Sequence, residues 1–300
     1  MAQNQRDVKN RISSISNIQK ITRAMEMVAA ARLRRAEQRI TALRPYAEAI
    51  RRMTRQAAQA AGAEATRLPL LAEHADERRV ALLLVTGDRG LAGAFNSQIV
   101  RAGVRTAAEY ESQGREMTWY ASGRRGVSSL QFRGREVTGA YTGFTDRPAF
   151  ADARGIADDL IAAYSDDKVD RIEVIYNGYV SPLTQIVRRE TLLPLAQAEV
   201  LGAESERSAD EPASHALVDY EPDPEAILRQ LIPDYVEISI YRALLESTAS
   251  EHGARMTAMR NASENAGEII TDLTLEMNRA RQAEITQEIM EVVAGAEGVS

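Results

Sequence analysis

The sequence has 300 residues, of which 44% are hydrophobic, with a formal net charge of −6 and no cysteine. The lack of cysteine excludes disulfides, thiolate catalysis and cysteine-based zinc sites. The longest purely aliphatic run, Val80–Val85, has six residues, far fewer than the roughly 20 that a membrane-spanning helix needs. We therefore expect a soluble chain that is either cytosolic or peripheral to a membrane.

Charge is unevenly distributed along the chain. Residues 1–60 hold thirteen Lys and Arg but only four Asp and Glu, a balance of +9, so the other 240 residues sum to −15. This asymmetry indicates an acidic partner for the N-terminal segment, in another molecule or in this one.

The first predicted element is a single long helix over residues 1–62. Between Gln3 and Gly62 the sequence has no glycine and one proline, Pro45, which is expected to kink or break the helix. Its apolar residues are spaced mostly three and four apart, which is typical of a coiled coil. These residues are Val8, Ile12, Ile15, Ile18, Ile21, Met25, Val28, Leu33, Ala36, Ile40, Leu43, Ala47, Ile50, Met53 and Ala57.

Residues 76–200 alternate between strand and helix patterns. The predicted strands are Val80–Val85, Met117–Ala121, a weak strand around Val137, Arg171–Tyr176 and Thr184–Leu193. The predicted helices are Ala94–Glu111, Arg124–Gln131 and Ala149–Tyr164. This order favours a parallel, Rossmann-like sheet with helices on its faces.

An acidic, turn-rich loop over 201–224 is followed by a second long helix over 225–296. Its apolar stripe is also spaced three and four apart, and neither long helix can bury such a stripe alone. We therefore predict that the two helices pair. The fold class is α/β: a long antiparallel coiled coil of the N- and C-terminal helices plus a central Rossmann-like α/β domain.

The stretch VTGDRGLAGAFN follows a strand and precedes a helix, where a phosphate-binding loop would lie. Its glycines, Gly87, Gly90 and Gly93, are three residues apart, which matches neither the dinucleotide-binding motif nor the P-loop. We interpret it as a tight turn held by Asp88 or Thr86. No cofactor is expected.

The three histidines, His74, His215 and His252, form neither a spaced metal motif nor a catalytic triad. His252 lies on the helical stripe and is interpreted as a packed or partly exposed helix residue, not as a ligand. The basic residues of 1–60 could bind a phosphate backbone, but for any one arginine we favour a solvated helix face.

Near the C-terminus, ARQAEITQE (Ala280–Glu288) is polar where a core-facing helix would carry leucine. Arg281 and Ile285 share one face of the helix, and Gln282 and Thr286 share the neighbouring face. Two interpretations stay open from these residues alone. One is an exposed helix end, and the other is a group of hydrogen-bond donors that bind a partner's carboxylates.

Two terminal segments together resemble the gamma subunits of F-type ATP synthases: QKITRAMEMVAAARLRRA (Gln19–Ala36) and ARMTAMRNASENAGEII…NRARQAEITQE (Ala254–Glu288). VTGDRGLAGAFN (Val85–Asn96) and YEPDP (Tyr220–Pro224) are also similar to that family. The resemblance covers nearly the whole chain in collinear order. Two departures, Gly87 and Ala92, lie in the α/β domain and replace residues that are commonly Ser and Cys. A third, Glu284, lies within the polar stretch near the C-terminus.

The resemblance implies a non-catalytic rotor subunit on the central stalk of a proton-translocating ATP synthase. Such a subunit couples rotation of the c-subunit ring to ATP synthesis or hydrolysis at the beta subunits. The implied partners are the alpha and beta subunits, the epsilon subunit and the c ring. With the family motif beginning almost at Met1, we expect a bacterial protein, peripheral on the cytoplasmic face of the plasma membrane.

The resemblance also implies roles for particular residues. Met25, Arg281, Gln282 and Thr286 match positions that contact beta subunits, the last three as a polar catch for carboxylates. Tyr220 and Glu221 match the foot segment that meets the c ring.

Two other classes of function remain as alternatives. The α/β domain could be an enzyme whose helical extensions serve oligomerisation, in which case residues 76–200 would bind a nucleotide tightly. The basic helix could instead bind nucleic acid, which the acidic remainder of the chain opposes.

Overall fold

The computed structural model describes residues 5–62, 68, 70–71, 77–195 and 223–297. The chain divides into two compact units, one built from Met1–Ala31 and Arg255–Ser300 and the other from Arg32–Ala254. Two long helices, α1 (Gln5–Ala61) and α6 (Pro224–Glu297), contribute residues to both units. Within the described residues, none of the helices has an apolar stretch suited to crossing a membrane.

The larger unit, Arg32–Ala254, contains one five-stranded sheet with the strand order β3-β2-β1-β4-β5. The strands are β1 (Arg79–Val85), β2 (Glu116–Ser122), β3 (Val137–Tyr141), β4 (Arg171–Ser181) and β5 (Thr184–Leu193). β1 to β4 are parallel, as predicted, but β5 runs antiparallel to β4. The prediction of a fully parallel sheet was therefore wrong at β5. Only two residues separate β4 from β5, too few for the crossover that parallel strands need.

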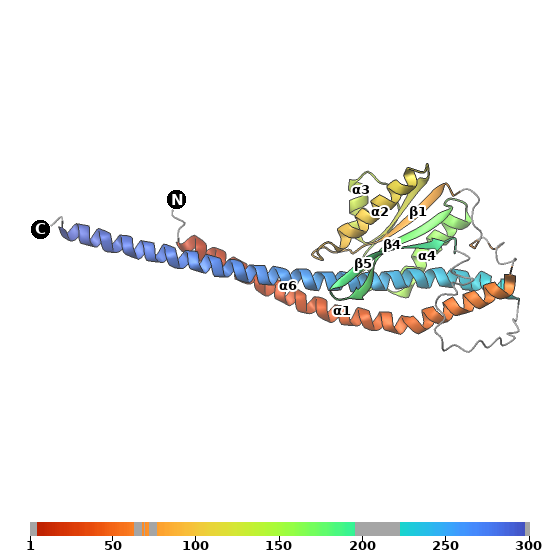
Figure 1. Ribbon diagram of the computed structural model, residues 1–300, viewed down its shortest axis with the longest axis horizontal. Helices are drawn as coiled ribbons and strands as arrows, with labels where there is room; N and C mark the ends of the chain where they lie inside the picture. The colour runs from red at the N-terminus through yellow and green to blue at the C-terminus, as the bar shows by residue number, and fades with distance from the viewer. Residues whose placement is uncertain (1–4, 63–67, 69, 72–76, 196–222, 298–300) are drawn as a thin grey trace. The chain divides into compact units, whose positions relative to one another are not determined.

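Three shorter helices connect the strands: α2 (Phe95–Glu111), α3 (Arg124–Phe132) and α4 (Phe150–Ser165). Each begins or ends within one residue or so of its predicted bounds. α2 and α3 lie together over the sheet (Figure 1), while α4 packs into a different apolar cluster with α6.

The buried strand β1 explains why both faces of the sheet are covered. Successive side chains of a strand point to opposite faces, and the run VALLLV has no polar residue for either face to expose. Val80, Leu82 and Leu84 join the cluster formed with α2 and α3. Ala81, Leu83 and Val85 join the second cluster.

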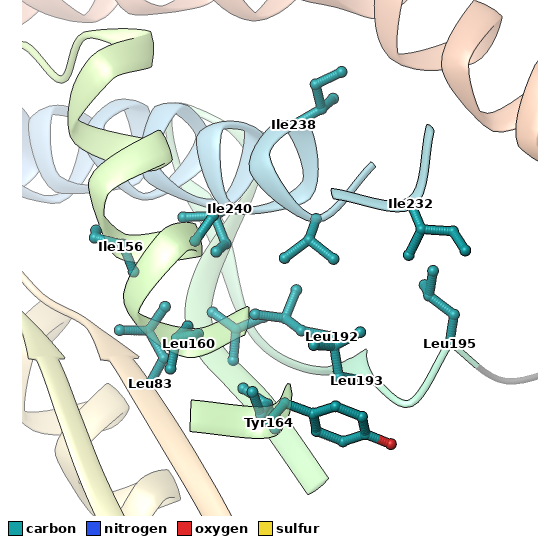
Figure 2. Packing of buried hydrophobic residues seen from close by; sticks show 14 of the residues in the cluster. Leu83, Ile156, Leu160, Tyr164, Leu192, Leu193, Leu195, Ile232, Ile238 and Ile240 are labelled. Carbon is teal, nitrogen blue, oxygen red and sulfur yellow. The ribbon is translucent and has the colours of Figure 1, made fainter. Parts of the chain in front are cut away.

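The second cluster extends from the sheet to the long helices. Figure 2 shows Ile156 and Leu160 of α4 near Leu83, with Ile232 and Ile240 of α6 beyond them. Side chains of α1, among them Ile50 and Ala57, belong to the same cluster. Within this unit the two long helices are therefore part of the hydrophobic core.

The helices themselves run through their prolines. α1 continues from Gln5 to Ala61 with Pro45 inside it, so of the two expected effects, a kink or a break, the break does not occur. Pro45 is exposed, and the carbonyl that it deprives of a donor can be solvated. Packing of Ala47 and Ile50 on the following turn holds the helix to the core.

In the smaller unit, the N-terminal part of α1 packs antiparallel to the C-terminal part of α6. Gln19 Nε2 donates to the carbonyl of Ser263 at 3.2 Å, and Arg260 Nε donates to Glu26 Oε1 at 2.9 Å. As the residue number rises in α1 it falls in α6, which defines an antiparallel pair. The predicted pairing of the two termini is confirmed.

The contact stripe of α1 differs in part from the prediction. Val8 and Leu33 are buried as expected, whereas Ile18, Ile21 and Val28 are exposed and the neighbouring Ala29, which was not in the predicted stripe, is buried. The buried position on that turn belongs to Thr22. Gly267 of α6 lies against Gln19 here, since a Cβ at position 267 would be 3.0 Å from Gln19 Nε2. The buried stripe of this segment therefore includes small and polar residues in place of the larger apolar side chains that were expected.

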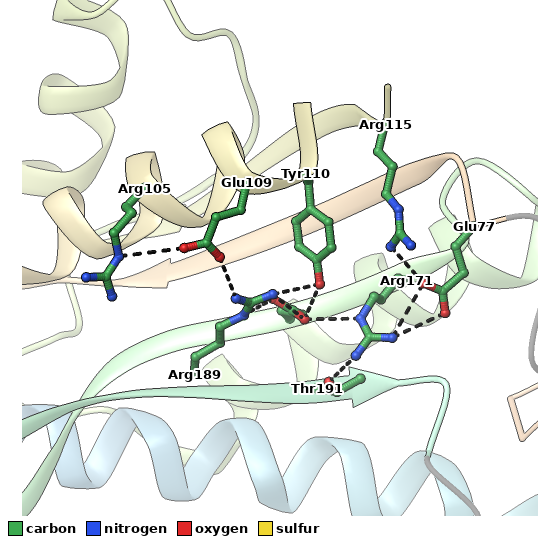
Figure 3. A network of polar contacts seen from close by, with 9 residues as sticks. Glu77, Arg105, Glu109, Tyr110, Arg115, Arg171, Arg189 and Thr191 are labelled. Carbon is green, nitrogen blue, oxygen red and sulfur yellow. Dashed lines mark hydrogen bonds and ion pairs between the residues drawn. The ribbon is translucent and has the colours of Figure 1, made fainter. Parts of the chain in front are cut away.

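A polar network joins α2 to the edge of the sheet (Figure 3). At its centre the buried Glu173 of β4 accepts hydrogen bonds from Arg189 at 2.6 Å, Tyr110 at 2.6 Å and Arg171 at 3.1 Å. Burial alone would raise the pKa of Glu173, but the bonds from Arg189 and Tyr110 outweigh it and lower the pKa. The network therefore holds an ionised carboxylate inside the domain.

Candidate functional site

The turn between β1 and α2 lies where an open α/β sheet would bind a ligand, at the carboxyl ends of its strands. In this protein the position is filled by the carboxylate of Asp88. Its Oδ1 accepts the Arg124 N–H at 3.0 Å, and its Oδ2 accepts the Gly143 N–H at 2.8 Å and the Thr145 hydroxyl at 3.0 Å. These donors come from the segments that follow β2 and β3, so one side chain joins three loops.

The charge of Asp88 is stabilised by these contacts. Burial disfavours the ionised form, but the hydrogen bonds from Arg124, Thr145 and Gly143 outweigh it and lower the pKa below the ordinary value. The backbone donors at this edge therefore face a carboxylate of the protein itself, which is ionised at neutral pH. A phosphate in the same place would meet like charge.

Close packing seals the rest of this edge. The Thr86 hydroxyl donates to the carbonyl of Ser122 at 2.8 Å and accepts the Gly126 N–H at 2.8 Å. A Cβ on Gly87 would lie 2.7 Å from the carboxylate of Glu251. The interpretation of VTGDRGLAGAFN as a tight turn held by Asp88 and Thr86 is confirmed.

The residues of the predicted polar catch lie on the C-terminal part of α6. Arg281, Gln282 and Thr286 are exposed, as are all other side chains from Ala283 to Met290. The Thr286 hydroxyl donates to the carbonyl of Gln282 at 2.8 Å, one turn back along the helix. Four large apolar side chains are exposed on the same segment: Ile285, Ile289, Met290 and Val292. This end of the helix presents both donors and apolar surface.

Met25 lies elsewhere on the helix pair. It is half-buried in α1, beside Glu26, whose carboxylate pairs with Arg260. Arg281 is twenty-one residues beyond Arg260 along α6, or about 30 Å at 1.5 Å per residue. Met25 and the polar catch are thus two separate surfaces of the helix pair.

Other predicted positions have different outcomes. Tyr220 and Glu221 lie outside the described residues, as do His74 and His215. His252 is buried on α6, in keeping with its interpretation as a packed helix residue. In the part of the chain that the structure describes, no group of acidic or histidine side chains is arranged to hold a metal ion.

The structure also brings together arginines that were considered one at a time from the sequence. Arg32, Arg35 and Arg39 of α1 line one cavity together with Arg147, which follows β3. The spacing 32, 35 and 39 follows one helix face, a signal that could have been read in the sequence. Arg147 could not have been placed there, because its position depends on the fold of the sheet.

Comparisons with known proteins agree with one another. A family model described as ATP synthase matches residues 4–299. The ATP synthase gamma chain of Rubrobacter xylanophilus is 44% identical over 295 residues, covering 98% of each chain. The ATP synthase gamma chain of Moorella thermoacetica is 42% identical over 294 residues, again covering 98% of each chain.

Solved structures give the same match. A chain in the central stalk and c-ring structure of the Tetrahymena thermophila mitochondrial ATP synthase aligns with a TM-score of 0.59 at 25% identity, covering 81% of this chain and 99% of that one. A chain of the Euglena gracilis mitochondrial ATP synthase aligns with a TM-score of 0.68 at 17% identity, covering 98% of this chain and 94% of that one, a likeness of fold.

Proposed function

Because this chain belongs to the ATP synthase gamma chain family, we propose that it is the central-stalk rotor subunit of a bacterial, proton-translocating F-type ATP synthase. In this role it couples rotation of the c-subunit ring to ATP synthesis or hydrolysis at the beta subunits. It is a non-catalytic subunit, and the nucleotide chemistry takes place in its partners.

The pairing of the two chain ends carries this proposal. A rotating shaft has to transmit torque without unwinding, and two helices packed along a common stripe resist twisting better than a single helix or a loop. The smaller unit contains such a pair, with contacts from Gln19 and Glu26 of α1 to Ser263 and Arg260 of α6. The division of labour we propose assigns the shaft to 1–62 and 225–296, and the base of the rotor to 76–200 with the acidic loop 201–224.

The exposed end of α6 is the proposed contact with the beta subunits. Arg281 presents a planar guanidinium, Gln282 an amide and Thr286 a hydroxyl, which are the donor types that bind carboxylates. A hydrogen bond to a charged partner contributes about 1.5–3 kcal/mol, and about 1.4 kcal/mol changes an affinity tenfold. A few such contacts, made with one beta subunit at a time, are enough to make the three nucleotide sites unequal. Met25 is the proposed second contact with a beta subunit.

The remaining partners follow from the same role. We assign the alpha and beta subunits to the shaft, and the epsilon subunit and c ring to the α/β domain. Tyr220 and Glu221, by the family resemblance, are the proposed contacts with the c ring. This places the chain at the cytoplasmic face of the plasma membrane, held there through its partners.

The catch is tested by replacing Arg281 and Gln282 with Ala in the reconstituted ATP synthase. We expect ATP hydrolysis coupled to proton pumping to fall at least tenfold, because the variant loses at least one charge-assisted hydrogen bond of about 1.5–3 kcal/mol. The measurement is ATPase rate and proton pumping in vesicles. Circular dichroism of the same variant is expected to match the wild type, since both side chains are exposed.

A matched control is Arg101→Ala, which removes the same charge from an exposed position on α2, in the α/β domain and not on the helix pair. It is expected to keep wild-type coupling. Wild-type turnover in the Arg281→Ala/Gln282→Ala variant would remove the catch from the mechanism. The enzyme alternative is tested by assaying the isolated chain for ATP hydrolysis, and turnover by the chain alone would contradict the rotor assignment.

A further inference from the structure

The larger unit contains a cavity of about 520 Å³ that the rotor function does not use. It lies between α1, the 142–149 segment after β3, and α6. Its lining residues are Arg32, Arg35, Ala36, Gln38, Arg39, Ala42, Asp146, Arg147, Leu245, Thr248 and His252. The volume falls within the range of roughly 300–1,000 Å³ that is usual for small-molecule sites.

The lining is strongly cationic. It has four guanidinium groups and one carboxylate, a balance of +3. The carboxylate, Asp146, is already engaged by the protein: it pairs with Arg32, and Arg89 Nη1 lies 3.8 Å from its Oδ2. Its other oxygen is buried and faces His252 Nε2 at 3.9 Å. The charge of Asp146 is therefore balanced by Arg32 and Arg89. The positive charges of Arg35 and Arg147, which also line the cavity, are not balanced by it.

The site is also held in place by hydrogen bonds. Arg39 Nη2 donates to the carbonyl of Pro148 at 2.6 Å and to the Tyr241 hydroxyl at 3.4 Å. The Thr248 hydroxyl donates to the carbonyl of Thr145 at 2.9 Å. α1, the 142–149 segment and α6 are thus connected around the cavity, so the elements that carry its arginines are already held together before a ligand binds.

We propose that this cavity binds an oligophosphate, an anion of two or more linked phosphate groups. Arginine forks bind phosphate oxygens in pairs, and several of them around one cavity suit an anion with several charged groups better than a single small ion. Among the described residues that line the cavity there is no Phe, Tyr or Trp, and the ring of His252 is buried beside Asp146, so the lining offers a nucleotide base no exposed stacking partner. Recognition is therefore of the phosphates, whether they belong to an inorganic chain or to the tail of a nucleotide.

The test is calorimetric titration of the full-length chain with inorganic tripolyphosphate, without magnesium and at fixed low salt. We expect one site per chain. Arg35→Gln and Arg147→Gln, both at exposed positions, are each expected to raise the dissociation constant about tenfold, and the double variant about a hundredfold. Orthophosphate and sulfate are expected to bind far more weakly, because each carries a single anionic group.

The matched control is Arg52→Gln, an exposed arginine of the same helix that does not line the cavity. It is expected to bind tripolyphosphate like the wild type. If Arg52→Gln lost as much affinity as Arg35→Gln or Arg147→Gln, the binding would depend on the net charge of the chain and not on this cavity. ATP is expected to match tripolyphosphate in affinity. If Arg35→Gln bound ATP as tightly as the wild type does, the assignment of the site to this cavity would be overturned. A wild-type chain that binds no tripolyphosphate would overturn the proposal while leaving the rotor function untouched.

Discussion

At the scale of single residues, Asp88 occupies with its own carboxylate the place where an α/β domain can bind an anionic ligand. The backbone N–H groups at the carboxyl end of this sheet could serve an external anion, as they do in nucleotide-binding folds. Here Asp88 accepts them instead, with the Arg124 and Gly143 N–H groups at 3.0 and 2.8 Å. A side chain that is part of the fold needs no ligand, and it keeps the three loops connected at all times.

Replacing Asp88 with Asn is expected to lower the free energy of unfolding by about 1–3 kcal/mol, because an amide nitrogen cannot accept the hydrogen bonds that one carboxylate oxygen now accepts. Urea denaturation of the full chain measures this. The control is Asp166→Asn, an exposed carboxylate paired with Lys168, for which a change below about 0.5 kcal/mol is expected. Equal effects in both variants would contradict the role of Asp88.

The pH dependence of this contribution follows from the lowered pKa of Asp88. A carboxyl whose pKa is lower in the folded than in the unfolded state stabilises the protein above its unfolded-state value, and the stabilisation is lost as the pH falls through the folded-state value. The loss therefore occurs below the ordinary value of 3.8. Asp88→Asn is expected to show a smaller decrease in stability than the wild type between about pH 4 and pH 2.

At the scale of elements, the Glu173 network ties helix α2 to strands β4 and β5. Figure 3 shows Tyr110 of α2 pointing to the same place as Arg171 and Arg189 of the two strands. β5 is an edge strand joined to β4 by a two-residue connection, so its antiparallel pairing is local and its attachment to α2 comes from side chains. The buried carboxylate supplies that attachment.

Glu173→Gln is expected to destabilise the chain by about 3–5 kcal/mol, because removing one partner of a buried ion pair leaves the others uncompensated. Thermal and urea unfolding would measure it. Glu111→Gln breaks an ion pair with Arg135 in which both side chains are 36% exposed, and should cost less than about 1 kcal/mol. A Glu173→Gln variant as stable as Glu111→Gln would show that the network contributes little.

At the scale of the whole molecule, the decisive feature is that the first and last segments of the chain fold against each other. The absence of cysteine in the sequence makes this directly testable by paired cysteine substitution. In Gln19→Cys/Gly267→Cys the two new side chains are adjacent, since a Cβ at position 267 lies 3.0 Å from Gln19 Nε2. A short bis-maleimide is expected to cross-link this variant efficiently.

The control is Gln19→Cys/Arg279→Cys, in which the second cysteine is twelve residues, or about 18 Å, further along α6. It is expected to cross-link poorly within one chain, and electrophoresis under denaturing conditions distinguishes the two products. Equal cross-linking of both variants would contradict the antiparallel register, and with it the interpretation of the helix pair as a shaft.

Much of this protein could be predicted from its sequence. The heptad spacing identified both long helices, and the run Val80–Val85 identified a strand buried on both faces. The predicted α2, α3 and α4 lie within about one residue of their observed bounds. Such features depend on local propensity and on the period of apolar residues, both of which are properties of the sequence itself.

Tertiary structure decided what depends on neighbours far apart in the chain. Ile18, Ile21 and Val28 fit an apolar stripe, yet they are exposed, whereas Thr22 and Ala29 of the same helix are buried. β5 turned antiparallel through its short connection to β4. Asp88, and the arginines around the 520 Å³ cavity, acquired their roles only when the sheet brought separate loops and helices together. The period of apolar residues in the sequence can show which face of a helix or strand is apolar. Which side chains are buried, which charges pair and where a cavity forms depend on contacts between segments that are far apart in the chain.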